Sequence, residues 1–220
     1  PRRRLEPVVA DRASVAAEVA RATALEGHPY LESRGLARAT LASQRFRGTW
    51  LRDGSPHGNV IFPHCDEQGL CGFEVKNHGF TGFAKGGSKG IWSSKVAASD
   101  ERLVIAESAI DALSYHQVNP HPKARYVSIA GAQNGKQAAL LESAISWMRA
   151  GSIVVAATDR DKAGDAYAER IAELCAKHPH VKYERHAPAL GKDWNDHLQA
   201  LRSHRRSLAP ELVQQRGLER

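Results

Sequence analysis

Cysteine is scarce in this sequence, and long apolar runs are absent from it. The three cysteines, Cys65, Cys71 and Cys175, are an odd and sparse set, which argues against a disulfide scaffold and favours a reducing cytoplasm. No apolar run approaches the ~18 residues that a membrane span requires, so we expect no membrane partner. Residues 1–10 lack the apolar core of a secretory signal.

Two familiar ligand motifs are also absent. No GxxxxGK[ST] spacing occurs, which excludes a Walker A phosphate loop. The residues His64, Cys65, Cys71 and His78 have a spacing that matches no common zinc site, so we interpret them as strand residues. The chain begins with Pro rather than Met, and we expect it to be a piece of a longer parent chain with further domains.

Positive charge is in excess. The formal net charge is +7 and the isoelectric point is near 9.5, with the surplus spread over both halves of the chain. This balance favours a polyanionic partner such as nucleic acid, although it does not indicate a fold. The 220 residues, 42% of them hydrophobic, are enough for one large domain or two small ones.

A polar run at residues 93–101 divides the chain into two patterns. Before it, residues 59–76 predict a β-hairpin. After it, apolar strands alternate with helices, which is typical of a mainly parallel α/β sheet with right-handed crossovers. We therefore predict a smaller N-terminal α+β accessory domain over 1–98, an α/β domain with a four-stranded sheet flanked by helices over 99–203, and a basic C-terminal tail over 204–220.

The strands expected in the second region indicate where a ligand site should lie. In parallel α/β sheets, ligands bind at the carboxyl ends of the strands. The run 153–158 is continuously apolar, which is typical of a strand buried on both faces. The expected strands are 102–106, 126–130, 153–158 and 181–185, and the expected helices are 108–117, 136–149, 163–177 and 194–201.

Three carboxylates directly follow two of these strands. Glu107 ends the first strand, and Asp159 and Asp161 follow the third. Carboxylates at one sheet edge repel one another, and a hard cation such as Mg²⁺, which prefers oxygen ligands, relieves the repulsion. For either Asp alone there is an ordinary alternative: Asp159 caps the following helix and Asp161 is a solvated acid of its first turn. For the three residues together, we predict a metal site.

The same residues carry a family resemblance. Residues 102–198 resemble the Toprim domain, which bacterial-type primases, topoisomerases, recombination proteins and certain nucleases share. The resemblance rests on Glu107 in IAESAIDALSY, the turn Gly131-Ala-Gln-Asn134, the run Asp159-Arg-Asp161-Lys-Ala-Gly164 and the late element Gly191-Lys-Asp-Trp-Asn-Asp196.

The resemblance implies roles for individual residues. Glu107 matches the general acid/base, Asp159 and Asp161 match the Mg²⁺ ligands (with Mn²⁺ as a substitute), and Asp111 matches an acidic position that orients the catalytic site. Capping of helix 194–201 is the alternative role of Asp193. The residues expected near phosphate or nucleic acid are Asn134, Arg160, Lys162 and Lys192, and the supporting ones are Gly131, Gly164, Asp193 and Asp196.

Residues 25–95 resemble a domain of unknown function that precedes Toprim domains in plasmid, phage and conjugative-element proteins, most of them primase-like or mobilisation-associated. The resemblance rests on the runs 30–35 and 59–63, on Gly72-Phe-Glu and on the run 86–92. It implies a DNA-handling role in a mobile element.

A stretch rich in Gly and Lys follows the hairpin, over residues 79–90. Backbone N–H groups and cations together can follow a phosphate backbone, and aromatic rings can stack on bases. The alternative is a surface loop with core aromatics. The candidates for phosphate contact are Lys85 and Lys89, and those for stacking are Phe80, Phe83 and Trp92.

These inferences lead to a main hypothesis and two alternatives. We predict a Mg²⁺-dependent enzyme of the Toprim class that carries out primase-like nucleotidyl or phosphodiester transfer, with single-stranded DNA and nucleotides as partners. A Mg²⁺-dependent nuclease would use the same residues on water. A non-catalytic nucleic-acid-binding module would keep the fold as a scaffold.

Overall fold

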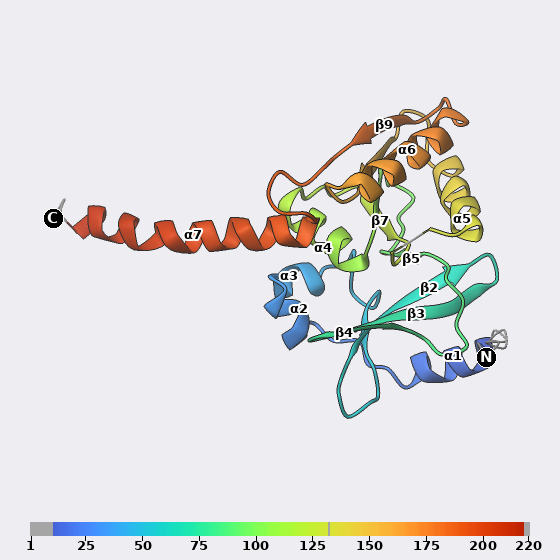
Figure 1. Cartoon of the computed structure of the whole chain (residues 1–220), viewed down its shortest axis with the longest axis horizontal. Helices are drawn as coiled ribbons and strands as arrows, with labels where there is room; N and C mark the ends of the chain where they lie inside the picture. The colour runs from blue at the N-terminus through green and yellow to red at the C-terminus, as the bar shows by residue number, and fades with distance from the viewer. Residues whose placement is uncertain (1–10, 132, 218–220) are drawn as a thin grey trace, which may run out of the picture.

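An antiparallel sheet and short helices form the N-terminal part of the chain (Figure 1). The computed structural model describes residues 11–131 and 133–217. The elements of this part are α1 (Arg12–Ala20), α2 (Pro29–Ser33), α3 (Arg38–Leu41), β1 (Leu51–Arg52), β2 (Val60–Asp66), β3 (Gly69–Asn77) and β4 (Phe80–Phe83).

The predicted hairpin becomes the centre of this sheet. β2 pairs with β3 around the turn between Asp66 and Gly69, and the strand order is β1-β2-β3-β4. Helix α1 covers one face, where Val15 packs with Ile61 and Phe73. The other face is turned towards the second part of the chain, so its side chains can take part in a site between the two.

A five-stranded sheet forms the second part. Its order is β5-β7-β6-β8-β9, and the pairs among β6, β7, β8 and β9 are parallel, so the four predicted parallel strands are confirmed. β5 is an additional edge strand, antiparallel to β7. The elements are β5 (Trp92–Ser93), β6 (Arg102–Ala106), α4 (Ala109–Val118), β7 (Ala124–Ser128), α5 (Gly135–Ser146), β8 (Ile153–Ala157), α6 (Lys162–Ala176), β9 (Lys182–Arg185) and α7 (Trp194–Gly217).

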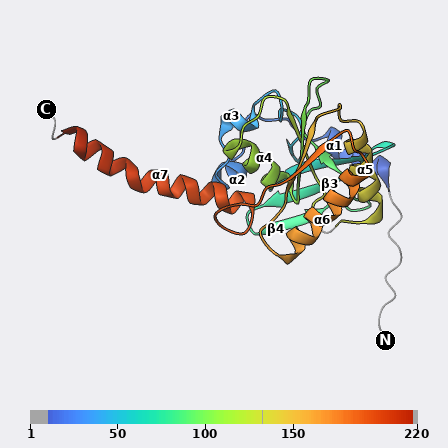
Figure 2. The same ribbon diagram turned by 90° about the horizontal axis from the view of Figure 1, so that it is seen from above.

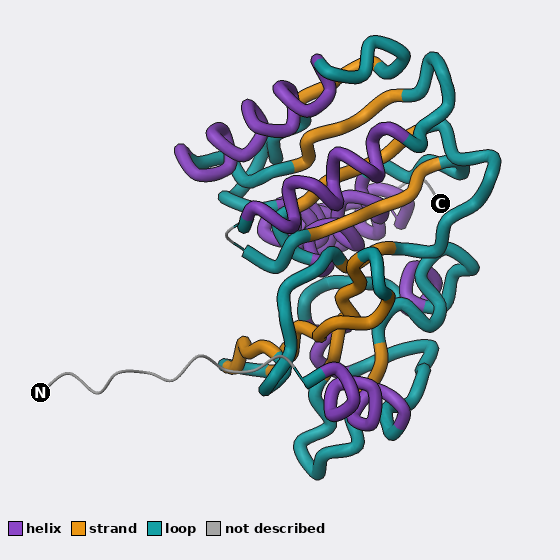
Figure 3. Tube along the Cα trace, turned by 90° about the vertical axis from the view of Figure 1, so that its right-hand side faces the viewer, coloured by secondary structure: helices purple, strands orange, loops and turns teal. Residues whose placement is uncertain are grey.

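Helices cover both faces of this second sheet (Figure 3). Leu103 and Ile105 of β6 pack with α5 and α6, whereas Val104 and Ala106 pack with α4 and α7. Each central strand is therefore apolar on both faces, as the continuous run in the sequence predicted.

One hydrophobic core joins the two parts. Leu31, Leu41 and Phe62 from the N-terminal part lie in the same cluster as Val104 and Leu113 from the second. This packing sets the N-terminal sheet against the face of the second sheet that carries α4. The predicted domain limits at residues 98 and 203 stay predictions.

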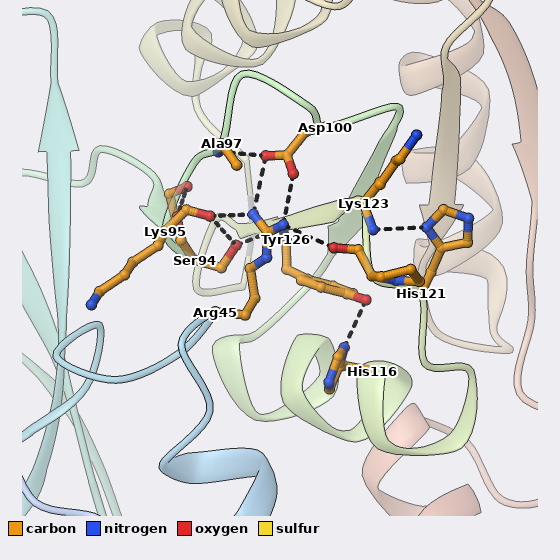
Figure 4. Close-up of polar contacts among 11 residues, drawn as sticks. Arg45, Ser94, Lys95, Ala97, Asp100, His116, His121, Lys123 and Tyr126 are labelled. Atoms are coloured by element: carbon orange, nitrogen blue, oxygen red, sulfur yellow. Dashed lines mark hydrogen bonds and ion pairs between the residues drawn. The ribbon is translucent and has the colours of Figure 1, made fainter.

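An ion pair fixes the connector between the two sheets, residues 94–101 (Figure 4). Arg45 donates two hydrogen bonds to the carboxylate of Asp100, at 2.7 and 3.0 Å, and a third to the carbonyl of Lys95 at 2.5 Å. Asp100 also accepts the N–H of Ala97 at 2.9 Å. The Asp100 side chain is only 4% exposed, so the guanidinium of Arg45 compensates a buried negative charge.

Helix α7 is much longer than the helix expected at 194–201. Its first turns pack on α4, with Trp194 and Leu198 in the shared core, and the rest extends away from the molecule (Figures 1 and 2). The predicted tail is thus helical up to residue 217, and residues 218–220 lie outside the described part. No helix in that part has the length and apolar character to cross a membrane.

Replacement of Arg45 should destabilise the fold. Arg45→Met leaves the Asp100 carboxylate buried without its cation, and we expect the free energy of unfolding to fall by about 3 kcal/mol in urea denaturation at neutral pH. The control is Lys123→Met, which removes an exposed ion pair with Glu101 (2.7 Å) and should leave the free energy of unfolding almost unchanged. Equal losses in the two variants would contradict this role of Arg45.

Stability should also fall in mild acid because of His64. This side chain is fully buried, with Nδ1 at 2.8 Å from the carbonyl oxygen of Gly90, and burial lowers its pKa from 6.5 to about 4. The unfolded chain therefore takes up this proton at higher pH than the folded chain, and stability is lost as the pH drops from 6.5 towards 4. At pH 5 the loss from His64 should be about 2 kcal/mol.

The variant His64→Asn isolates this effect. It keeps an N–H near the Gly90 carbonyl but cannot be protonated, so its free energy of unfolding should depend less steeply on pH between 7 and 5. Chemical denaturation of both proteins across that range provides the measurement. Parallel pH dependences would show that His64 is not responsible.

Candidate active site

The carboxyl ends of β6 and β8 meet where the chain leaves the sheet in opposite directions. β6 leads to α4 on one face and β8 leads to α6 on the other, which is where parallel sheets open a crevice. Glu107 directly follows Ala106 of β6, and Asp159 lies two residues after Ala157 of β8, which pairs with Ala106. Glu107 accepts the N–H of Asp159 at 3.1 Å. The structure brings together these two predicted ligands, which we call the strand-end pair.

Asp161 has a different environment. It is the N-cap of α6, where its carboxylate accepts the N–H of Gly164 at 2.8 Å, and it forms an ion pair with Lys192 at 3.0 Å. These two contacts, the Gly164 N–H first, lower its pKa. The capping role considered for Asp159 thus belongs to Asp161. In the described part of the chain, no group of three or more His, Cys, Asp or Glu side chains is arranged to hold a metal.

A cleft of about 750 Å³ opens beside the strand-end pair, and two further carboxylates line it. Asp111 comes from the first turn of α4, and Asp193 directly precedes α7. Asp111 is 7% exposed, and it accepts the Ser108 hydroxyl at 2.5 Å and the N–H of Asn195 at 3.2 Å. These hydrogen bonds fix it at the floor of the cleft.

Crowding of the carboxylates raises two pKa values. The pKa of Asp159 rises to about 7, first through burial and then through the charges of Asp111 and Glu107. The pKa of Asp111 also rises to about 7, first through burial and then through the charge of Asp193. Oδ1 of Asp159 is buried and lacks a hydrogen-bond partner among the described residues. A buried, unpaired oxygen among other carboxylates fits the ligand chemistry of a divalent cation.

Strand β3 supplies the opposite wall of the cleft, and sequence reasoning missed it. Glu74 and Lys76 lie on the same face of β3 and form an ion pair at 2.8 Å, and Arg34 lines the cleft near them. Glu74 is 5% exposed, and its Oε2 has no partner within the described residues. The sequence did contain one signal for this wall, because Glu74 and Lys76 are charged residues at alternate positions of a predicted strand. Which sheet they would face depends on packing between distant segments.

The residues predicted to contact phosphate are dispersed. Lys89 donates to the carbonyl of Ala130 at 2.9 Å, and Arg160 donates to the carbonyl of Ala189 at 3.0 Å, so both side chains hold loops in place. Of the residues predicted to contact phosphate, only Lys192 forms an ion pair with one of the three predicted metal ligands, Asp161. Of the others, Asn134 caps α5, while Lys85 and Lys162 are exposed.

The supporting residues stabilise turns around the cleft. Gly164 is closely packed, because a Cβ there would lie 2.1 Å from the carbonyl oxygen of Asp159, and Gly131 has a positive φ of 86°. Asp193 accepts the N–H of Asp196 at 2.7 Å, as the capping alternative predicted, while also lining the cleft. Asp196 in turn accepts the backbone N–H of Lys192 at 3.2 Å.

The three aromatic candidates for stacking differ in exposure. Trp92 is fully buried, and its indole N–H donates to the carbonyl of Thr49 at 2.6 Å. Phe83 is half-buried against His64, whereas Phe80 is 53% exposed. The core alternative therefore holds for Trp92.

Comparison with known proteins identifies the family of the second part. Residues 104–198 match the family model described as Toprim-like. This region is a Toprim-like domain. Residues 29–100, directly before it, match the family described as a protein of unknown function (DUF3991). Both family resemblances are confirmed. No curated protein matches the sequence.

The Toprim-like domain and the part before it share the fold of solved primase structures. The primase fragment of the bacteriophage T7 primase-helicase protein is 18% identical, with a TM-score of 0.53 over 81% of this chain and 71% of that one. A chain from the bacteriophage T7 lagging-strand DNA polymerase interacting with primase domains bound to an RNA/DNA hybrid and dTTP is also 18% identical, with a TM-score of 0.53 over 86% and 90%. At this identity the similarity concerns the fold.

The acidic cleft should cost the Toprim-like domain stability at high pH. Because the pKa of Asp159 is raised from 3.8 to about 7, the folded state holds a proton that the unfolded state releases, and stability falls as the pH rises through this range. Without divalent metal, Asp159→Asn should raise the free energy of unfolding at pH 8 by on the order of 1 kcal/mol, after allowance for solvent screening.

The gain should shrink at pH 4, where the Asp159 carboxyl of the folded wild-type protein is protonated and adds no negative charge to the cleft. The control Asp165→Asn alters a carboxylate of the following helix α6 that is 70% exposed, and it should leave stability unchanged at either pH. Urea denaturation in EDTA gives both values. A loss of stability in Asp159→Asn at pH 8 would contradict the idea that the Asp159 charge destabilises the cleft.

Proposed function

We propose that this protein is a Mg²⁺-dependent enzyme of the Toprim class that carries out primase-like nucleotidyl or phosphodiester transfer on nucleic acid. The observation that carries the proposal is the cleft in which Asp111, Asp193 and the strand-end pair lie opposite Lys76 and Arg34. Phosphoryl transfer requires positioned oxygens and stabilisation of negative charge, and this arrangement offers ligands for a cation on one wall and cations on the other.

Glu107 is the proton-transfer group in this proposal. The N–H of Asp159 holds one of its carboxylate oxygens at 3.1 Å, which orients the group to accept a proton from an attacking hydroxyl or return it to a leaving oxygen. Asp111 acts by orientation, since its hydrogen bonds hold Ser108 and the start of α7 beside the strand-end pair.

Asp159 and Glu107 would hold the cation, with Asp161 next to them on the same loop. The unpaired Oδ1 of Asp159 and the raised pKa values of the neighbouring carboxyls support this assignment. When bound, Mg²⁺ or Mn²⁺ supplies charge stabilisation at the phosphoryl oxygens.

Cationic side chains around the cleft would receive the phosphates of the substrate. The ammonium group of Lys76 is paired with Glu74 at 2.8 Å and donates to the Thr81 hydroxyl at 3.4 Å. These two contacts hold the ammonium group along the β3 wall of the cleft. Lys192 lies at the other side, paired with Asp161. We propose single-stranded DNA and nucleotides as substrates; the similar T7 complex contains primase domains bound to an RNA/DNA hybrid and dTTP.

Incubation with labelled single-stranded DNA, ribonucleotides and Mg²⁺ tests the proposal. We expect oligoribonucleotide synthesis that EDTA abolishes and that Asp159→Ala lowers by at least roughly 100-fold, because the cation loses a ligand. Asp161→Asn is informative because asparagine also caps helices, so its activity loss would report a role beyond capping α6.

The control for this experiment is Asp165→Ala, which removes an exposed carboxylate of α6 and should keep full activity. Circular dichroism confirms that each variant is folded. Shortened DNA in place of new oligonucleotides would indicate a nuclease. Nucleic-acid binding without any Mg²⁺-dependent product, unchanged in Asp159→Ala, would favour a binding module and overturn the proposal.

A further inference from the structure

A second hollow lies on the other side of Glu107, between α5 and α6, which are neighbours on one face of the sheet (Figure 1). Its volume is about 630 Å³. The small side chains of Ala138 on α5 and of Ala163 and Ala166 on α6 keep the space between the helices open. A space of this size, apolar with a few polar groups, is typical of small-molecule sites. The proposed catalytic reaction does not use it.

Two polar groups on this hollow lack partners. Tyr167 is 2% exposed, and its hydroxyl has no hydrogen-bond partner among the described residues. Nε2 of Gln133 is likewise buried and unpaired in the described part, while its Oε1 accepts Nε of Arg170 at 3.1 Å. Burial of an unpaired polar group costs free energy unless a ligand or water satisfies it. Both groups can donate to acceptor atoms of a ligand.

The rim of the hollow carries hydrogen-bond donors and a cationic side chain. A capping box satisfies two of the N–H groups at the start of α5, and the N–H groups of Gly135 and Lys136 remain as donors at the positive end of a 12-residue helix. The guanidinium of Arg170 lies 5.6 Å from the centroid of the Tyr167 ring. Together these groups form an anion-binding edge next to an apolar space.

We propose that this hollow binds a nucleotide. The phosphate would lie between the start of α5 and Arg170, and the base would fill the alanine-lined space with its polar edge on the Tyr167 hydroxyl. A phosphate needs N–H donors and a cation, while a base needs a flat apolar space and a hydrogen bond, and the hollow provides both. Glu107 lines this hollow as well as the catalytic cleft, so the nucleotide would bind behind the strand-end pair, away from β3.

Titration calorimetry with ATP in EDTA tests the site independently of catalysis. We expect saturable binding to the full chain. Tyr167→Phe, which removes one hydroxyl and keeps the ring, should weaken it roughly fivefold, and Arg170→Gln should weaken it at least roughly tenfold. The matched control is Lys177→Gln, which removes a 56% exposed cation from the far end of the same helix and should leave the affinity unchanged.

Asp159→Ala separates this site from the catalytic cleft, because it should retain ATP binding in EDTA while losing activity. Loss of ATP binding in Asp159→Ala but not in Arg170→Gln would place ATP in the cleft and overturn the proposal. Unaltered affinity in both Tyr167→Phe and Arg170→Gln, or no binding at millimolar ATP, would also overturn it. If inorganic phosphate binds as tightly as ATP, the site recognises an anion rather than a nucleotide.

Discussion

The parallel pairing of β6 with β8 is the constraint on which the candidate site depends. Its register brings Glu107 and Asp159 to the same edge of the sheet, where like charges repel each other. The repulsion does not separate them, because burial of the two apolar strands fixes the backbone and the N–H of Asp159 is itself donated to Glu107. Apolar packing thus builds an acidic cleft in which the pKa values of Asp159 and Asp111 are raised to about 7, and perturbed pKa values are common at functional sites.

The opposite wall of the cleft comes from a distant part of the chain. Glu74 and Lys76 stand on β3, and the shared hydrophobic core, rather than any contact among the polar groups, holds this strand against the Toprim-like domain. The Arg45–Asp100 ion pair fixes the connector between them, which cannot shift without leaving a buried charge unpaired. The N-terminal part is therefore a component of the cleft as well as a neighbour of it.

Local sequence patterns predicted the parallel sheet and the acids that end its strands, because burial on both faces produces continuous apolar runs. They did not reveal which aspartate caps α6, since that depends on how the backbone turns as it leaves β8, and the cap is Asp161. The wall formed by Glu74 and Lys76 depends on long-range packing that no local pattern encodes. β5 has only two residues, too few for a periodic signal, and the outer part of α7 contains Pro210, a residue that is unfavourable inside a helix.

The turn after β8 leaves no room for a side chain at Gly164, where a Cβ would lie 2.1 Å from the carbonyl oxygen of Asp159. Any other residue there would displace the backbone that carries the acidic wall. The wall on β3 is built differently, because Glu74 and Lys76 project from a strand whose backbone pairs with β2 and β4 independently of these side chains. Under the proposed function, substitutions on β3 can alter the contacts to the substrate without disturbing the acids, which makes the N-terminal sheet the part of the cleft open to evolutionary change and to redesign.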